Sequence, residues 1–162
     1  MNNRETNLKD VQRAFDVHGD MVYRLAIMRT QNRADAEDVV QDVFLRYIQS
    51  APDTADRDYE KAWLIRVTVN RTKSLANSAW NRKTVCLAHI TEPQAETMPS
   101  EVYEAVLQLP RRYRTVVHLF YYEGFKTAEI AGLLSANEAT VRSWLHRARQ
   151  ELRKTIDIED KE

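Results

Sequence analysis

The sequence has few of the residues that break or cross-link a polypeptide chain. Three glycines and four prolines among 162 residues argue against the many tight turns of a strand-rich architecture, and so favour an all-helical fold. The single cysteine, Cys86, excludes an internal disulfide and a cysteine-based zinc cluster. The N-terminus is polar, and no apolar run approaches the ~18 residues that cross a bilayer. We therefore expect an all-α, cytoplasmic protein with no membrane insertion.

An excess of one charge is also lacking, since 24 basic residues balance 24 acidic ones. The two signs are nevertheless separated along the chain. Residues 1–60 hold eight bases and twelve acids, residues 61–90 hold six bases and no acid, and residues 91–110 hold four acids and no base. This separation predicts an acidic surface for a basic partner and basic surfaces for nucleic acid.

Residues 109 to 154 show the clearest pattern. Pro110 is suited to the start of a helix and Gly124 to its end. Thr127 is the expected N-cap of a short second helix that ends near Leu134, and Asn137 is the expected N-cap of a third. A short helix, a turn and a helix with a basic outer face are typical of the helix-turn-helix motif, whose second helix lies in a DNA major groove.

The outer face of the third helix is the predicted DNA-reading surface. Its first turns would reach base edges, and the arginines that follow would bind phosphates. The predicted contacts are Asn137, Glu138, Ala139, Thr140, Arg142, Ser143, His146, Arg147 and Arg149, followed by Arg153. The alternative is an ordinary helical hairpin with solvated charges, because five bases against two acids between residues 137 and 154 is a mild excess. We favour DNA binding because the capped turn and the one-sided arginines occur together.

Residues 33–49 form the cleanest amphipathic helix of the N-terminal half. Apolar residues recur along one side at helical spacing. The other side carries Asp35, Asp38 and Asp42, which repel one another. This polar side is either a solvated helix face or a docking surface for a basic partner.

A basic helix is predicted from about residue 59 to the low eighties. Arg66, Asn70, Lys73 and Asn77 follow one another at helical spacing, and Trp80 lies near the same line. Cationic side chains hold a nucleic-acid backbone and aromatic rings stack on unpaired bases, so this row suits a melted strand. A solvated basic face with a packed tryptophan is the equal alternative.

The whole pattern predicts two small helical domains, at residues 1–83 and 101–162, joined by a linker at residues 84–100. The linker breaks helical periodicity and contains two prolines. A first helix is expected at about residues 8–28, with His18 as a packed core histidine rather than a metal ligand. No metal-ligand cluster, phosphate-binding loop or nucleophile–base pair is visible that would predict a cofactor or an enzyme.

Three stretches, in order, resemble the extracytoplasmic-function class of bacterial RNA polymerase sigma factors, within the sigma-70 family. They are DAEDVVQDVFLRYIQ (Asp35–Gln49), WLIRVTVN (Trp63–Asn70), and LPRRYRTVVHLFYYEGFKTAEIAGLL with ATVRSWLHRAR (Leu109–Arg149). The resemblance covers nearly the whole chain, and it implies that the two domains are sigma region 2 and sigma region 4. It further implies a protein without catalytic activity or cofactor that binds core RNA polymerase and directs promoter-specific initiation.

The resemblance also assigns partners to the predicted surfaces. Docking on the clamp helices of the polymerase β′ subunit would use Asp35, Asp38, Gln41, Asp42 and Leu45. Recognition and melting of the −10 promoter element would use the loop at residues 50–58 and the basic helix, with contacts from Asp53, Thr54, Asp56, Arg66, Asn70, Lys73, Asn77 and Trp80. Region 4 would read the −35 element and bind the flap of the β subunit. Many relatives are held inactive by an anti-sigma factor, which is a further candidate partner.

The chain departs from the family pattern at three positions of the last domain. Ser135 and Ala139 stand where glycine is usual, and the turn at Ser135 favours a positive φ. Trp144 replaces a commoner basic residue, and we expect it to pack. Two other functions are kept as alternatives, a stand-alone helix-turn-helix regulator and a small helical enzyme. The acidic helix face and the basic helix disfavour the regulator because neither suits a ligand pocket.

Overall fold

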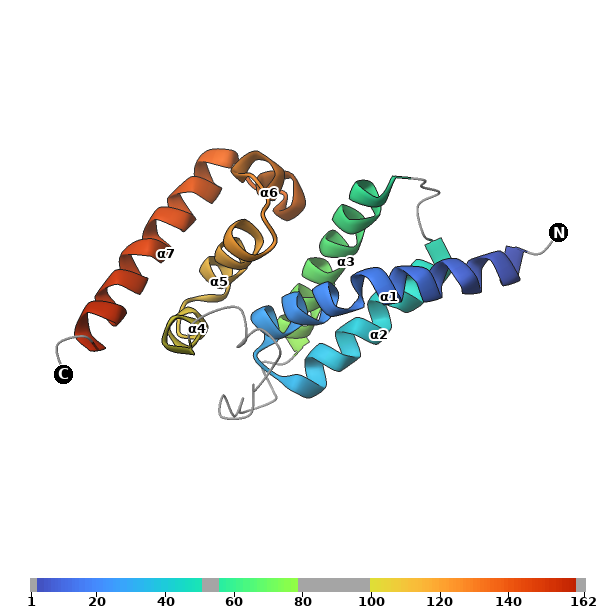
Figure 1. The fold of residues 1–162 in the computed structure, drawn as a ribbon, viewed down its shortest axis with the longest axis horizontal. Coiled ribbons are helices and arrows are strands. Elements are labelled where there is room, and N and C mark those ends of the chain that lie inside the picture. Colours follow the sequence, from blue (N-terminus) through green and yellow to red (C-terminus); the bar gives the residue numbers. More distant parts are fainter. Residues whose placement is uncertain (1–2, 51–55, 79–99, 160–162) are drawn as a thin grey trace. The chain divides into compact units, whose positions relative to one another are not determined.

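The computed structural model describes residues 3–50, 56–78 and 100–159 of the chain. All regular secondary structure in these ranges is helical (Figure 1), which confirms the all-α prediction. The chain divides into two compact units, residues 1–87 and residues 88–162. Each unit buries an apolar core of its own, in agreement with two small helical domains.

Three helices make up the described part of the N-terminal unit: α1 (Asn3–Thr30), α2 (Arg33–Ser50) and α3 (Arg57–Ser78). Gln31 takes a positive φ of 53°, which ends α1 and turns the chain toward α2. Asn32 then caps α2, because its side-chain oxygen accepts the backbone N–H of Asp35 at 3.0 Å. All three helices contact one another, and each contributes apolar side chains to the core, among them Val22, Leu25, Val39, Val43, Leu64 and Ile65.

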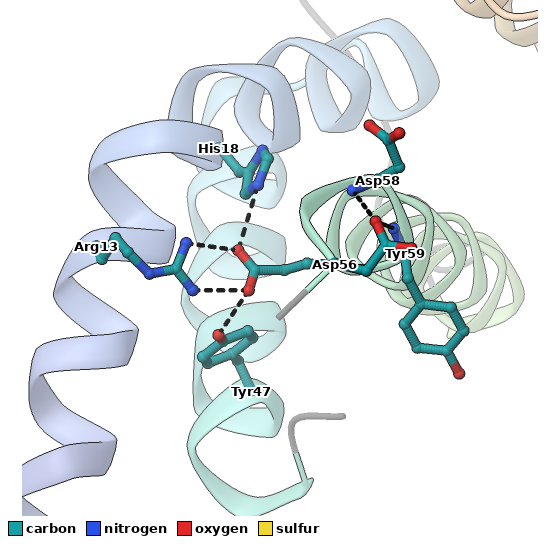
Figure 2. A network of polar contacts seen from close by, with 7 residues as sticks. Arg13, His18, Tyr47, Asp56, Asp58 and Tyr59 are labelled. Atoms are coloured by element: carbon teal, nitrogen blue, oxygen red, sulfur yellow. Dashed lines mark hydrogen bonds and ion pairs between the residues drawn. The ribbon is translucent and has the colours of Figure 1, made fainter. Parts of the chain in front are cut away.

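One buried carboxylate joins the three helices of this unit (Figure 2). The Glu60 side chain on α3 is 2% exposed, and its oxygens accept hydrogen bonds from the Arg13 guanidinium of α1 at 2.8 and 3.2 Å. The Tyr47 hydroxyl of α2 donates to the same carboxylate at 3.1 Å. His18 Nε2, also on α1, lies 3.3 Å from it. Residues from all three helices therefore meet at a single buried acid.

The titration of these groups reflects burial and mutual hydrogen bonding. Burial acts to raise the pKa of Glu60, but the hydrogen bonds from Arg13 and Tyr47 outweigh it and hold the pKa below its ordinary value. Burial and the hydrogen bond to Glu60 raise the pKa of Tyr47 to about 12. Burial also lowers the pKa of His18, which favours the neutral ring. His18 is thus a buried core residue, as its place on the apolar stripe of α1 predicted.

The described part of the C-terminal unit consists of four α-helices and one π-helical segment. In chain order they are α4 (Ser100–Leu107), α5 (Arg111–Val117), η4 (His118–Tyr122), α6 (Thr127–Leu134) and α7 (Glu138–Glu159). Every element adds to one apolar core, which includes Val106, Val116, Leu119, Ile130, Val141 and Leu145. Trp144 is half-buried, in keeping with its expected packing role.

The helix that follows Pro110 differs in detail from the predicted one. Pro110 is its N-cap, with φ −53° and ψ 149°, so the helix itself begins at Arg111. The helix then widens into a π-helix over His118–Tyr122, a form that regular helical spacing does not predict. Gly124 has a φ of 76° and follows the end of the π-helix, as predicted from its residue type.

The N-cap predicted for α6 was one residue late. The cap is Lys126, whose backbone N–H donates to the Glu129 side chain at 3.1 Å, half of a capping box. Thr127 is the first helical residue, and its hydroxyl donates instead to Glu138 Oε1 of α7 at 3.0 Å. Asn137 occupies the N-cap position of α7, as predicted, and its carbonyl accepts the N–H of Val141 at 3.0 Å.

Replacing Glu60 by alanine should lower the free energy of unfolding of the N-terminal unit by about 1–3 kcal/mol, the usual cost when buried hydrogen-bonding groups lose their partner. Tyr47 and His18 would lose a buried partner, and Arg13 would lose its ion pair. Urea unfolding of the full chain followed by far-ultraviolet circular dichroism measures the change.

The matched control is Glu37→Ala. Glu37 pairs with Arg33 one helical turn earlier at 3.3 Å, but both side chains are more than half exposed. Such surface pairs contribute only about 0.3–0.5 kcal/mol. Similar losses in Glu37→Ala and Glu60→Ala would contradict a central role for the buried carboxylate.

The turn before α7 offers a second stability test. Ser135 has φ 53° and ψ 45°, the left-handed region in which a side chain is strained. Ser135→Gly should therefore raise the free energy of unfolding of the C-terminal unit by about 0.5–1 kcal/mol, after the greater freedom of glycine in the unfolded chain is counted. The same substitution within α7, Ser143→Gly, should lower it by about 0.5 kcal/mol. Thermal unfolding measures both changes. Midpoint temperatures that shift in the same direction for both variants would exclude relief of backbone strain at Ser135.

Candidate partner and nucleic-acid surfaces

The polar side of α2 combines acids with an exposed apolar residue. Asp38, Gln41 and Leu45 lie at helical spacing and are all exposed, and 54% of the Leu45 surface is accessible. Asp35 and Asp42, at the edges of this side, are half-buried. We call these five residues the acidic face of α2. An exposed large apolar side chain beside carboxylates suits a partner that is basic and partly apolar.

The outward side of α3 carries the predicted cationic row. Arg66, Asn70 and Lys73 are exposed along one line of the helix, and we refer to them as the α3 row. Asn77 lies within α3, but its side chain, like Asp53, Thr54 and Trp80, falls outside the described residues. Their predicted contacts with the −10 element thus stay predictions.

Asp56 has a local structural role that the sequence pattern did not indicate. Its side-chain oxygen accepts the backbone N–H groups of Asp58 at 3.0 Å and Tyr59 at 3.4 Å, the bonds of a helix N-cap (Figure 2). A carboxylate that caps α3 is already engaged by the backbone. Asp56 therefore caps the start of α3, and the base contact expected for it stays a prediction.

Arg71 is a functional candidate that sequence reasoning missed. Its Nε donates to Asp42 Oδ2 at 2.5 Å, which links α3 to the acidic face of α2. The side chains of Asp42 and Arg71 are 37% and 25% exposed. Arg71 follows Asn70 directly and so points about 100° around the helix from Asn70, and further still from Arg66 and Lys73. The offset of Arg71 from Asn70, toward α2, is the one feature of the sequence that could have indicated its pairing with Asp42.

The outer side of α7 presents most of the predicted DNA contacts to solvent. The exposed members are Asn137, Ala139, Arg142, Ser143, His146, Arg147, Arg149 and Arg153. Glu138 and Thr140 are half-buried. The described structure therefore brings the predicted set onto one helix, with two members turned partly toward the unit itself.

Glu138 positions Arg142 within this surface. Its Oε1 accepts hydrogen bonds from Arg142 Nη2 at 2.6 Å and from the Thr127 hydroxyl at 3.0 Å. These two bonds lower the pKa of the Glu138 carboxyl and keep it ionised. The carboxylate thus ties the start of α6 to the start of α7 and directs the Arg142 guanidinium.

Arg149 is exposed, and its side chain also contacts aromatic residues of the same unit. Its guanidinium lies 5.7 Å from the centre of the Phe120 ring and 5.5 Å from that of Tyr121. Its Nε also donates to the Tyr121 hydroxyl at 2.5 Å. The expected phosphate contact by Arg149 would therefore compete with an aromatic site formed by η4.

Beside Arg149 the C-terminal unit has an apolar groove of about 430 Å³. It lies between α4, the α5–η4 segment and α7. Its lining residues are Val102, Val106, Val117, Tyr121, Leu152 and Ile156, with Arg149 and Arg153 at the same site. An apolar floor with two arginines suits an apolar segment that also carries acidic groups.

The described ranges, residues 3–50, 56–78 and 100–159, hold neither a metal-ligand cluster nor a membrane-spanning helix. No group of three histidine, cysteine, aspartate or glutamate side chains in those ranges is placed to hold a metal ion. No helix in the same ranges is both long and apolar enough to span a bilayer.

Comparison with known proteins identifies both units. Residues 14–82 match the family described as Sigma-70 region 2, and residues 100–152 match Sigma-70, region 4. ECF RNA polymerase sigma factor SigL of Mycobacterium tuberculosis is 34% identical over 152 residues, which cover 88% of this chain and 86% of SigL. SigE of Mycolicibacterium smegmatis, another ECF RNA polymerase sigma factor, is 32% identical over 148 residues, which cover 84% of this chain but 57% of SigE.

The fold agrees with these relatives. The sigma factor RpoE of Bartonella quintana, solved in complex with the anti-sigma factor NepR, has a TM-score of 0.74 at 20% identity, over 93% of this chain and 98% of RpoE. CnrH, solved with the cytosolic domain of CnrY, has a TM-score of 0.67 at 23% identity. The chain therefore belongs to the sigma-70 family of RNA polymerase sigma factors, in its extracytoplasmic-function (ECF) class. The stand-alone regulator is not favoured.

Proposed function

We propose that this chain binds core RNA polymerase in the cytoplasm and directs promoter-specific initiation of transcription. Region 2 would occupy residues 1–83, the linker residues 84–100 and region 4 residues 101–162. One observation carries the proposal: the region 2 unit holds an acidic face on α2 and a cationic row on α3, while the region 4 unit holds a helix-turn-helix. Such a factor acts by binding the polymerase and DNA rather than by catalysis of its own.

The acidic face of α2 is the proposed docking surface for the clamp helices of the β′ subunit. Asp38 is exposed, and among the described residues it has no ion pair that docking would have to break. Leu45 adds a large apolar contact at the C-terminal end of the same line. Carboxylates around an apolar anchor would steer and then hold a basic helical partner.

The two DNA surfaces lie on different units. The α3 row would hold the melted strand of the −10 element through backbone contacts, since charge and amide donors there face solvent. The exposed start of α7 would read the −35 element in the major groove, with Arg142 directed by Glu138. A helix-turn-helix used in this way gains its affinity from phosphates and its choice of sequence from base edges.

The groove of region 4 is the proposed contact for the β flap. Its apolar lining and the arginines Arg149 and Arg153 would accept an apolar segment with acidic neighbours. An anti-sigma factor is a second candidate partner of the chain, since RpoE and CnrH were both solved with protein partners, NepR and CnrY. Both assignments are inferences from surface chemistry and from these relatives.

Reversal of one charge on α2 tests the docking surface. Asp38→Lys should weaken binding of the full chain to an immobilised β′ clamp-helix fragment by about tenfold or more, because it places like charges together. Glu37→Lys is the control, since residue 37 points about 100° around α2 from residue 38 and is likewise exposed. Equal retention of wild type and Asp38→Lys would exclude this surface.

Run-off transcription by purified core polymerase and this protein tests both the activity and the −35 contact. Arg142→Ala should reduce the preference among −35 variants by the equivalent of about 1–3 kcal/mol if Arg142 makes a bidentate base contact. Arg147→Ala, expected to lose a phosphate contact, should lower output from all templates alike. An unaltered preference in Arg142→Ala would rule out the base contact, and no protein-dependent transcript from genomic promoter fragments would contradict the function itself.

A further inference from the structure

The ion pair between Asp42 and Arg71 connects two surfaces that are proposed to bind different partners. Asp42 belongs to the acidic face of α2, whereas Arg71 follows Asn70 of the α3 row. Arg71 Nε lies 2.5 Å from Asp42 Oδ2. As long as this pair persists, one carboxylate of the docking surface is neutralised and one guanidinium is kept from the nucleic acid.

The pair is exchangeable rather than structural. Its side chains are 37% and 25% exposed, so water and other charges reach both groups. Ion pairs of this exposure shift an equilibrium by only about two- to fivefold. The cohesion of the three helices rests instead on Glu60, which is 2% exposed and joins α1, α2 and α3. Loss of the Asp42–Arg71 pair would therefore leave the fold intact.

We propose that Arg71 is a further DNA-binding residue, held off the melted strand by Asp42 until a basic side chain of the docked polymerase takes that carboxylate. The inference rests on the proposed function of α2 and α3. A cation from the clamp helices that approaches the acidic face would pair with Asp42 in place of Arg71. The released guanidinium, on a long side chain next to Asn70, would then add a phosphate contact on the side of Asn70 that faces α2.

This arrangement makes the charge that α3 offers to the strand conditional on docking. Before docking, the row offers the strand the two cations Arg66 and Lys73, and after docking Arg71 adds a third cation outside the row. Each contact with a single-strand phosphate steepens the dependence of log affinity on log salt concentration by about 0.7. The number of contacts can therefore be counted from salt titrations, independently of the absolute affinity.

The experiment measures binding of the full chain to a short fluorescein-labelled single-stranded DNA of mixed sequence, by anisotropy over a range of salt concentrations. Asp42→Asn, which breaks the pair without a polymerase, should raise affinity about two- to fivefold at low salt and steepen the salt dependence by about 0.7. Asp42→Asn combined with Arg71→Gln should show neither change. Asp38→Asn removes an equal charge from the same face. It is the matched control for a general loss of repulsion between the carboxylates of α2 and the DNA phosphates.

A second arm adds the β′ clamp-helix fragment. The fragment should steepen the salt dependence of the wild type and fail to do so for Arg71→Gln. Circular dichroism and thermal melts of each variant establish that all remain folded. If the fragment steepens the salt dependence of Arg71→Gln as much as that of the wild type, the proposal is overturned.

The outcomes separate this inference from the function on which it rests. Lys73→Gln tests the α3 row itself, because Lys73 has no part in the Asp42–Arg71 pair. One outcome is that Lys73→Gln weakens DNA binding while Asp42→Asn and Asp38→Asn change the affinity and its salt dependence equally. That result would support DNA binding by the α3 row and overturn the role of Arg71. If Lys73→Gln has no effect, the strand-binding surface is wrong, and the role of Arg71 is overturned with it.

Discussion

The buried Glu60 carboxylate is the interaction on which the N-terminal unit depends. Apolar burial drives the three helices together, but it is not directional and does not by itself set their register. The Glu60 carboxylate is 2% exposed and accepts hydrogen bonds from Arg13 and Tyr47. Because hydrogen bonds are directional, they restrict the positions that the three helices can take relative to one another. Because α2 and α3 are held at this point, the acidic face and the α3 row are presented in a defined relation to each other.

The C-terminal unit uses a carboxylate differently. Glu138 also joins two helices, through Thr127 and Arg142, but its side chain is 40% exposed. Bonds at such exposure contribute little to stability, and their effect is to direct the Arg142 side chain. The fold of this unit rests instead on its apolar core and on backbone features, the π-helix and the left-handed residue Ser135. The two carboxylates thus differ in effect, since Glu60 joins three helices in the core and Glu138 directs an exposed arginine.

Several charges assigned to partners are already engaged within the chain. Asp42 pairs with Arg71, Arg142 with Glu138, and Arg149 with the Tyr121 hydroxyl. Together with zero net charge, these contacts reduce the attraction of the isolated chain for nucleic acid. Weak binding by the chain alone would suit a sigma factor, because the assembled polymerase, and not the free factor, would then select the promoter.

Local patterns in the sequence were sufficient for the helices and for most of the exposed rows. Helical spacing alone identified Asp38 and Leu45 on α2, Arg66 and Lys73 on α3, and the basic outer side of α7, because the side-chain period of a helix is a local property. The positive φ at Ser135, expected because the family usually has glycine there, was also confirmed.

What remained undetermined by the sequence was the partner of each charged side chain. Arg13 meets Glu60 across 47 residues, Arg71 meets Asp42 across 29, and Arg149 meets Tyr121 across 28. No period or cap signal reaches so far, because these contacts exist only once helices have packed at particular angles. The sequence by itself thus determined where helices form and which sides face solvent. Only the tertiary structure decided which of those charges are already paired, because pairing depends on distances that packing sets.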